Sequence, residues 1–110
     1  MEIKDHEKAK IITLIEKIDS LTSREIDQAF QGLLATGARN IVCNCERTKY
    51  ISSAGLRVFL LVAKALKKSG GQLCVVCPKT SYAYEVLETA GFTNILSVCE
   101  TETAALQQLS

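Results

Sequence analysis

Tryptophan, proline and net charge are all scarce in this chain, and each shortage excludes a class of protein. There is no Trp, aromatic residues make up 5%, and the formal net charge is only +1 over 110 residues. A protein that stacks bases needs an aromatic platform, and one that reads a nucleic-acid groove needs a concentrated basic face. We therefore expect no nucleic acid among its partners. One Pro and six Gly leave no room for a low-complexity linker, so we expect a single domain spanning residues 1–110.

Long apolar runs are also absent. None approaches the ~20 residues that a membrane-spanning helix needs, so we expect no membrane span. The N-terminal segment 1–8 is charged and lacks the apolar core of a signal peptide. These features predict a cytoplasmic protein. The apolar content of 47% and the charged content of 23% are typical of an ordinary globular domain.

Cysteine occurs five times, an odd number that favours reduced thiols in a chain without a secretion signal. Cys74 and Cys77 have the CxxC spacing of redox and zinc sites, so a small thiol oxidoreductase is one functional hypothesis. The pair lies in a strand-like run, however, where an odd separation places two side chains on opposite faces. Cys43 and Cys45 share a face but have no matching second pair, and the only His is His6. We interpret the cysteines as core residues and expect no metal site and no cofactor.

Strand-like and helix-like segments alternate along the chain. Apolar and β-branched runs predict strands at 2–7, 9–15, 40–45, 72–76 and 95–98. Apolar residues at helical spacing predict helices from Thr22 to the Gly37 stop, over 54–68, from Thr80 or Ser81 to the Gly91 stop, and after the Thr101 cap. Thr22 and Glu25 fit a capping box. The alternation predicts an α/β fold, a single sheet of about four to five mostly parallel strands covered by about four helices.

The most informative segment is 49–60, in which two serines and a glycine begin an amphipathic helix. A hydroxyl at a helix N-terminus lies near free backbone N–H groups and the positive end of the helix dipole, which favour a bound or covalently attached phosphate. We therefore predict a phosphorylation site at Ser53. A Ser ahead of a helix is more commonly only an N-cap, and this is how we interpret Ser52.

Asp19 follows one predicted strand, and the Ser52–Ser53 turn follows the next. The carboxyl ends of parallel strands lie at one edge of a sheet and carry its sites, so we expect Asp19 and Ser53 to lie close together. Asp19 could hydrogen-bond the Ser53 hydroxyl or make a local Asx turn, and both interpretations stay open. Arg57, one helical turn past Ser53, could contact a partner, as could an exposed apolar residue such as Leu61.

Three short segments carry a recognisable pattern. Tyr50 to Leu56 reads YISSAGL, an aromatic and a hydrophobic residue followed by Ser-Ser-Ala-Gly-Leu. Glu16 to Asp19 reads EKID, and Asn40 to Asn44 reads NIVCN, a hydrophobic strand that ends in Asn. Together with the order of the elements over nearly the whole chain, these segments resemble the STAS domain, in particular the bacterial anti-sigma factor antagonists (anti-anti-sigma factors). The YISSAGL segment is the specific match.

The resemblance implies a STAS-like sheet and a partner switch. In that family an anti-sigma factor, often a GHKL-type serine kinase, phosphorylates the domain on a serine, and a PPM-type serine phosphatase removes the phosphate. The unphosphorylated domain binds the anti-sigma factor and so frees the sigma factor. By position the acceptor is Ser53, and Asp19 corresponds to the acidic residue near it, where it could help the kinase to place its metal. The implied partner-binding residues are Asp19, Ser52, Ser53, Gly55 and Arg57.

Two positions depart from the family pattern. Ser52 stands where phosphorylated members often have Asp, which makes it a second conceivable acceptor, and Glu16 replaces the usual Gly. Ser52 in place of Asp supports an alternative function, a non-phosphorylated STAS scaffold within a signalling or transport complex. No His or second carboxylate is placed to act as general base for a serine nucleophile, because His6 lies in the N-terminal segment. We therefore predict that the protein is not an enzyme.

Overall fold

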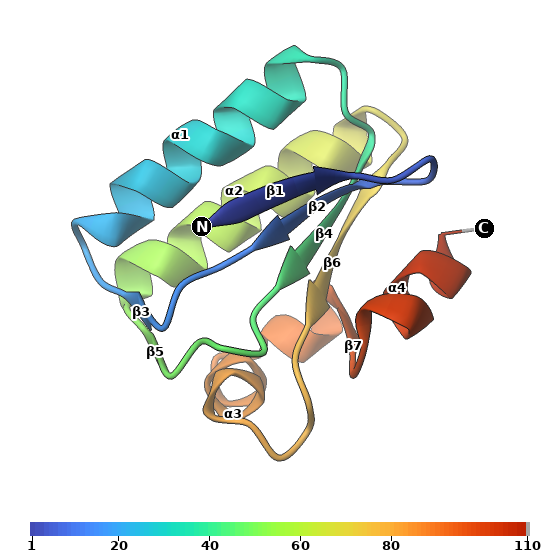
Figure 1. The fold of residues 1–110 in the computed structure, drawn as a ribbon. Coiled ribbons are helices and arrows are strands. Elements are labelled where there is room, and N and C mark those ends of the chain that lie inside the picture. The colour runs from blue at the N-terminus through green and yellow to red at the C-terminus, as the bar shows by residue number, and fades with distance from the viewer. Residues whose placement is uncertain (110) are drawn as a thin grey trace.

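The computed structural model describes residues 1–109 and shows an α/β fold built on a five-stranded sheet (Figure 1). Its strands are β1 (Glu2–Asp5), β2 (Lys10–Thr13), β4 (Asn40–Asn44), β6 (Gln72–Val76) and β7 (Ser97–Cys99), and they lie in the order β1-β2-β4-β6-β7. β1 is antiparallel to β2, whereas the other neighbouring pairs are parallel. The mostly parallel sheet predicted from the alternation of strands and helices is therefore confirmed.

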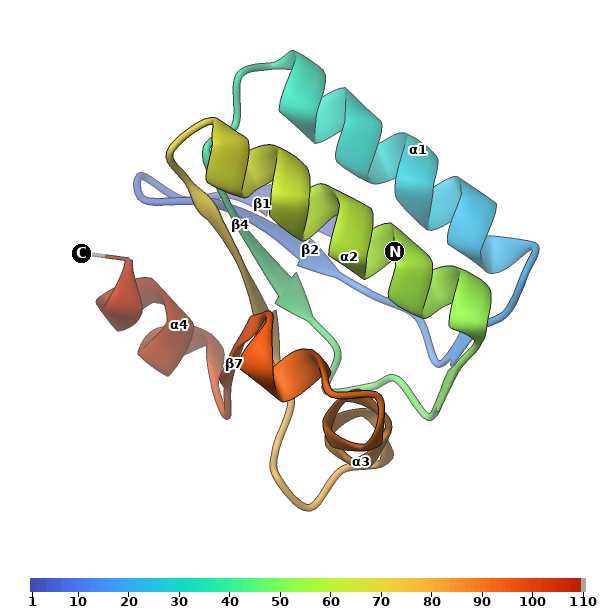
Figure 2. The ribbon, with the colours of Figure 1, turned by 180° about the vertical axis from the view of Figure 1, so that it is seen from behind.

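Helices cover both faces of this sheet. They are α1 (Thr22–Ala35), α2 (Ser53–Lys68), α3 (Tyr82–Thr89) and α4 (Glu102–Gln108), with a 3-10 helix over Phe92–Asn94. Figures 1 and 2 show α1 and α2 side by side on one face and α4 on the other. The predicted helices are thus present. α1 and α3 are each followed by a glycine with positive φ, 84° at Gly37 and 80° at Gly91, as expected of helix stop signals.

Side chains that alternate along the strands divide the core into two layers. The layer under α1 and α2 contains Ile12, Ile41, Cys43 and Val75 from the strands and Ile26, Phe30, Phe59, Val62 and Leu66 from the helices. The layer under α4 contains Ile11, Val42, Cys74, Val76 and Ala105. Because both faces of the central strands are buried, the inner residues of these strands are apolar, and polar residues occur only at the strand ends. This is why they were readily recognised in the sequence.

A second, two-stranded sheet was not predicted. It consists of β3 (Lys17–Ile18) and β5 (Tyr50–Ile51), which pair in parallel beside the N-terminal end of α2. Strands of two residues have no periodicity that a sequence could reveal. Their pairing nevertheless decides where the candidate site is assembled.

The last predicted strand begins two residues too early. The sequence favoured a strand at 95–98, whereas β7 spans Ser97–Cys99. The backbone N–H groups of Ile95 and Leu96 donate to the Phe92 carbonyl (2.9 and 2.8 Å) and so continue the turn of the 3-10 helix. Ile95 is exposed, so its apolar character did not mark a buried strand.

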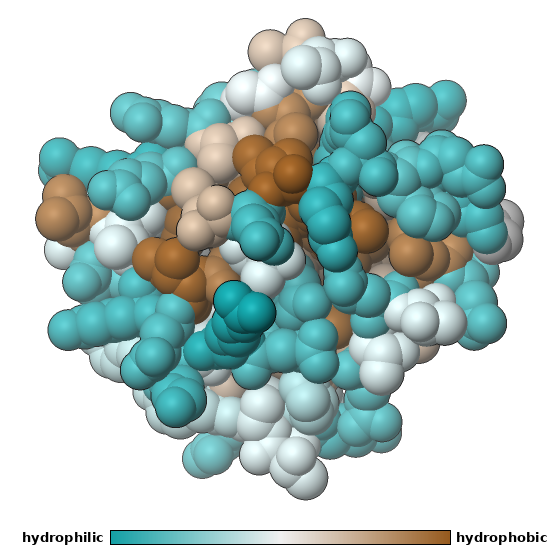
Figure 3. All heavy atoms as spheres, in the orientation of Figure 1, coloured by the Kyte–Doolittle hydropathy of each residue, from teal (hydrophilic) through white to brown (hydrophobic). Residues whose placement is uncertain are grey.

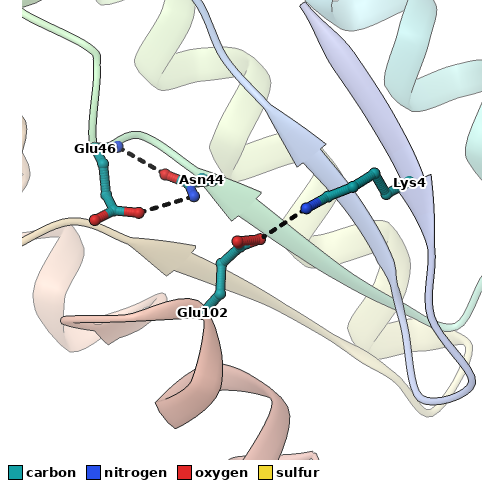
Figure 4. Close-up of polar contacts among 4 residues, drawn as sticks. All are labelled: Lys4, Asn44, Glu46 and Glu102. Carbon is teal, nitrogen blue, oxygen red and sulfur yellow. Dashed lines mark hydrogen bonds and ion pairs between the residues drawn. The ribbon is translucent and has the colours of Figure 1, made fainter.

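Two polar contacts involve residues of the main sheet, one from β1 and one from β4 (Figure 4). Lys4 on β1 places Nζ 3.9 Å from Oε1 of Glu102 at the start of α4. The buried Asn44 closes the turn after β4, because its Nδ2 donates to Glu46 Oε1 (3.0 Å) and its Oδ1 accepts from Glu46 N (2.9 Å). The amide of Asn44 is thereby satisfied, as a buried polar group requires. The Lys4–Glu102 pair is partly exposed and contributes at most about 1 kcal/mol.

The surface facing the viewer in Figure 1 is mostly hydrophilic, and its apolar atoms form separate patches (Figure 3). The large apolar residues that are exposed on the molecule are Met1, Ile3, Leu21, Tyr50, Leu61, Tyr82 and Ile95. Within residues 1–109, no helix has both the length and the apolar character needed to cross a bilayer. Single exposed apolar residues are common. Each one indicates a binding surface only where the neighbouring residues also favour binding.

Candidate functional site

The β3–β5 pair brings together two segments that are more than thirty residues apart in the sequence. Ile18 pairs with Ile51, and the backbone N–H of Ser52 donates to the Ile18 carbonyl at 2.8 Å. Asp19 therefore lies beside the Ser52–Ser53 turn. This confirms the expected proximity, although the two segments follow the short strands β3 and β5 rather than the long strands of the main sheet.

Ser52 is the N-cap of α2. Its backbone is extended (φ −78°, ψ 166°), and its hydroxyl accepts a hydrogen bond from Gly55 N at 3.2 Å. The Ser52 carbonyl accepts the first helical bond from Leu56 N at 3.0 Å. The interpretation of Ser52 as a cap is therefore confirmed. Its side chain is half-buried and already holds one of the free N–H groups of the helix.

Ser53 is the first residue of α2, and it is exposed. Its hydroxyl makes no hydrogen bond to any of the residues 1–109. The first turn of α2 contains no acidic residue, so the positive end of the helix dipole is not neutralised by its own side chains. The local chemistry is therefore that of an accessible alcohol at an anion-favouring helix terminus.

Gly55 lets α2 approach the β3–β5 pair closely. A Cβ at this position would lie 2.6 Å from Ile18 Cγ2 and 3.2 Å from Ile51 Cγ2. Because Gly55 is buried, its contribution to the site is to packing of the helix. Direct contact with a partner is left to its exposed neighbours.

The carboxylate of Asp19 caps α1. Its Oδ1 accepts from Leu21 N (3.0 Å) and Thr22 N (2.9 Å). These bonds, chiefly the one from the Thr22 backbone, hold the pKa of the Asp19 carboxyl below its usual value. The local-turn interpretation is the one that the geometry supports, since among the described residues no hydrogen bond joins Asp19 to Ser53.

The capping box predicted for Thr22 and Glu25 is wrong. The Thr22 hydroxyl accepts from Asp19 N at 2.8 Å and donates to the Lys17 carbonyl at 3.0 Å, so it joins β3 to the start of α1. Asp19 takes the capping role instead because the turn at Ser20 and Leu21 folds the backbone N–H groups onto its carboxylate.

Two large apolar side chains flank the site. Leu21, beside Asp19, is 67% exposed, and Tyr50, on β5, is 44% exposed. Lys17 Nζ lies 6.0 Å from the centroid of the Tyr50 ring, at the limit of a cation–π contact. Sequence reasoning did not single out Leu21, although its position before the helical apolar pattern of α1 was a usable signal. Arg57, one turn past Ser53, is exposed and is therefore accessible to a partner.

The cysteines are placed as core residues. Cys74 belongs to the layer under α4, whereas Cys77 belongs to the layer under α1 and α2, so their thiols lie on opposite faces of the sheet. Burial raises the pKa of the Cys77 thiol to about 12. Cys43 and Cys45 are also buried, with their sulfur atoms 3.9 Å apart. The hypothesis of a thiol oxidoreductase that uses Cys74 and Cys77 is therefore wrong. Over residues 1–109, no cluster of three or more His, Cys, Asp or Glu side chains could hold a metal ion.

Comparison with known proteins agrees with this architecture. BtrV of Bordetella bronchiseptica, which is named as a candidate anti-sigma factor antagonist, is 38% identical over 88 residues, which cover 80% of this chain and 75% of BtrV. The crystal structure of an anti-sigma factor antagonist from Mycobacterium paratuberculosis superposes with a TM-score of 0.88 at 19% identity, over 98% of this chain and 91% of that one.

The phosphorylated form of SpoIIAA, a cell fate determinant of Bacillus, has the same fold. It superposes with a TM-score of 0.75 at 19% identity, over 99% of this chain and 98% of SpoIIAA. Residues 1–105 match the family described as the STAS domain. This match covers nearly the whole sequence and includes both strands and the helix that build the Ser53 turn. The chain belongs to the STAS domain family.

Proposed function

We propose that this protein is an anti-sigma factor antagonist whose binding is switched off by phosphorylation of Ser53. When Ser53 is unmodified, the domain sequesters an anti-sigma factor, a GHKL-type serine kinase, and a sigma factor is freed. A PPM-type serine phosphatase resets the switch. The observation that carries the proposal is the exposed Ser53 hydroxyl at the N-terminus of α2, in a STAS fold with a 38% identical relative named for this role.

The protein acts in this proposal as a cytoplasmic binding module of one domain, 1–110, and not as an enzyme. The contact surface comprises the exposed Ser53 and Arg57 and the half-buried Asp19 and Ser52, with the buried Gly55 holding this end of α2 in place. Ser52 is the weaker candidate acceptor because its hydroxyl is half-buried and engaged as the N-cap of α2. Ser53 has neither restriction.

Phosphorylation at Ser53 changes binding more than it changes folding. A phosphoserine adds roughly −1.5 to −2 charges at neutral pH. At the first turn of a helix, the dipole and the free N–H groups favour that charge by about 0.3–1 kcal/mol. A partner surface that lacks a compensating Arg or Lys would have to bury an unpaired dianion, at a cost of several kcal/mol. Since ~2.7 kcal/mol weakens binding a hundredfold, the modification abolishes binding without unfolding the domain.

The test is phosphorylation by the purified GHKL-type kinase of the same genome with ATP, followed by mapping of the phosphate by mass spectrometry. We expect the label on Ser53, none in Ser53→Ala, and normal labelling of the matched control Ser52→Ala. Isothermal titration should show that Ser53→Ala binds the kinase and that Ser53→Asp binds about a hundredfold more weakly, since the added charge faces the partner. Labelling of Ser52, or equal affinity of Ser53→Asp and the wild type, would contradict the proposal.

One observation favours a second function, a STAS scaffold that is never phosphorylated. Ser52 occupies the position where phosphorylated members of the family often have Asp beside the acceptor. Such a scaffold would bind its partner with equal affinity whether or not kinase and ATP had been supplied. The labelling experiment separates the two functions, because the scaffold predicts binding without any phosphate on Ser53.

A further inference from the structure

The outward side of α2 carries charge of one sign. Between Ser53 and Lys68 the helix contains no Asp or Glu. Five of its exposed residues follow one another at spacings of four, four, three and four, which places them on one side of the helix. We call this set the α2 stripe: Ser53, Arg57, Leu61, Lys64 and Lys68.

Nothing in the described part of the fold covers this stripe. In Figure 2, α2 lies in front of the sheet with α1 beside it, and no other element passes over its outward side. The ion pairs within residues 1–109 are Lys4–Glu102 and Lys10–Asp5, so Arg57, Lys64 and Lys68 are not neutralised by acids of the same molecule. A helix face that meets only water usually mixes both signs of charge. The absence of acids along α2 is therefore informative.

Leu61 lies within this basic stripe and is 52% exposed. The apolar face of α2, with Phe59, Val62 and Leu66, is packed into the core, so Leu61 is not part of the internal packing pattern. An apolar side chain bordered by charges of one sign is suited to enter a recess of a partner while the charges pair around its rim. Lys68 is the weakest evidence for a docking surface, because a cation is favoured at any helix C-terminus.

We propose that the α2 stripe is the docking surface for the protein partner of the Ser53 switch, and that this partner presents an acidic face with an apolar recess for Leu61. The inference rests on the proposed function for the identity of the partner. A membrane fits less well, because an amphipathic helix binds lipid through its apolar face, and that face of α2 is buried. A nucleic acid fits less well because the net charge of the chain is only +1.

Docking on this stripe also explains how phosphorylation of Ser53 weakens binding of the partner. Ser53 lies at the head of the stripe, so a phosphate there would face the same acidic surface that Arg57 and Lys64 attract. Two anionic groups in a shared, partly desolvated contact repel each other. The same charge that the helix N-terminus tolerates therefore opposes docking of the partner.

The experiment measures binding of the purified kinase that labels Ser53 to three variants. In Lys64→Glu, we expect the Kd to rise at least about tenfold at 0.1 M salt and the effect to shrink toward 1 M salt, where the Debye length falls from about 10 to 3 Å. In Leu61→Ser, loss of the apolar contact should raise the Kd about tenfold at both salt concentrations. The matched control Lys79→Glu makes the same charge change on the loop after β6 and should leave the Kd within about twofold.

The two proposals fail in different ways. If Lys64→Glu and Leu61→Ser bind like the wild type while Ser53→Asp binds weakly, the docking surface is overturned and the switch stands. If the kinase neither labels nor binds the wild type, the proposed function fails. Photo-crosslinking from p-benzoylphenylalanine at position 61 in living cells then tests whether the α2 stripe is a docking surface. An adduct with an acidic protein that disappears in Lys64→Glu supports it. An adduct with a second copy of this chain, with lipid or with nucleic acid, or no adduct, overturns it.

Discussion

Replacing Gly55 by Ala tests how closely α2 packs on the β3–β5 pair. In most helices this substitution is stabilising, since Ala is favoured over Gly by about 1 kcal/mol. Here the new Cβ would lie 2.6 Å from Ile18 Cγ2, closer than carbon atoms can approach, and Ile18 is fully buried. Either Ile18 or the helix must move, and overpacking of this kind costs about 1–3 kcal/mol. We expect Gly55→Ala to lower the free energy of unfolding by about 1 kcal/mol.

Gly32 provides the matched control. It lies in α1, is exposed, and a Cβ built there meets nothing within 4 Å. Gly32→Ala should therefore raise the free energy of unfolding by about 0.5–1 kcal/mol. The two variants make the same chemical change, so the difference between them, about 2 kcal/mol, isolates the steric term at Gly55.

Urea unfolding followed by circular dichroism measures both variants, with an unchanged m-value as the sign that the denatured states are comparable. A double mutant adds Ile18→Leu, which removes the Cγ2 methyl and should recover part of the loss. Non-additivity of the two changes would show that Gly55 and Ile18 are coupled. If Gly55→Ala is stabilised as much as Gly32→Ala, the close packing described above is refuted.

Two further predictions concern titratable groups. Hydrogen bonds from the start of α1 lower the pKa of Asp19 from 3.8, so the stability that its carboxylate contributes is present above that pH and is lost as the pH falls through the lower folded value. Wild type should exceed Asp19→Asn in stability at neutral pH and lose this advantage in acid; a pH-independent difference in urea unfolding would contradict the capping role. Burial raises the pKa of both Cys77 and Cys99, but Cys99 is only half-buried whereas the other four cysteines are buried. Ellman's reagent should therefore label chiefly Cys99 in the native protein at mildly alkaline pH. Rapid reaction of all five thiols before denaturant is added would refute this packing.

In the proposed switch, the residues that stabilise the turn differ from the residue that the partner contacts. Ser52 holds the helix N-terminus through its bond to Gly55 N, and Gly55 packs against Ile18. Ser53, between them, takes no part in either contact and is exposed. A charge can therefore be added to Ser53 without disturbing the two residues that keep the turn in place.

Apolar patterns and capping residues within single segments were sufficient to predict most of the secondary structure. The apolar strands β2, β4 and β6 are long enough to show their burial, and the helices show a helical apolar period with Ser or Thr at the start. Thr101 caps α4 as predicted, by accepting from Ala104 N. Of the two predicted starts of α3, Thr80 and Ser81, it is Ser81 that caps the helix, by accepting from Tyr84 N. These features follow from neighbouring residues alone, and alternation of such strands and helices permits few topologies. The fold class and the position of the Ser53 turn were therefore predictable.

The sequence by itself determined that a serine begins an amphipathic helix after a buried strand, because capping and apolar periodicity are local properties. Only the tertiary structure decided that Ile18 and Ile51 pair, that Asp19 caps α1 rather than binding Ser53, and that the rest of residues 1–109 leaves the basic side of α2 uncovered. The pairing and the uncovered face depend on how segments far apart in the chain pack, whereas the cap of α1 is a local turn that the sequence left open between two interpretations. Strands of two residues have no periodic pattern, so the pairing of β3 with β5, and the close approach of Gly55 in α2 to that pair, are decided by the packing of the whole domain.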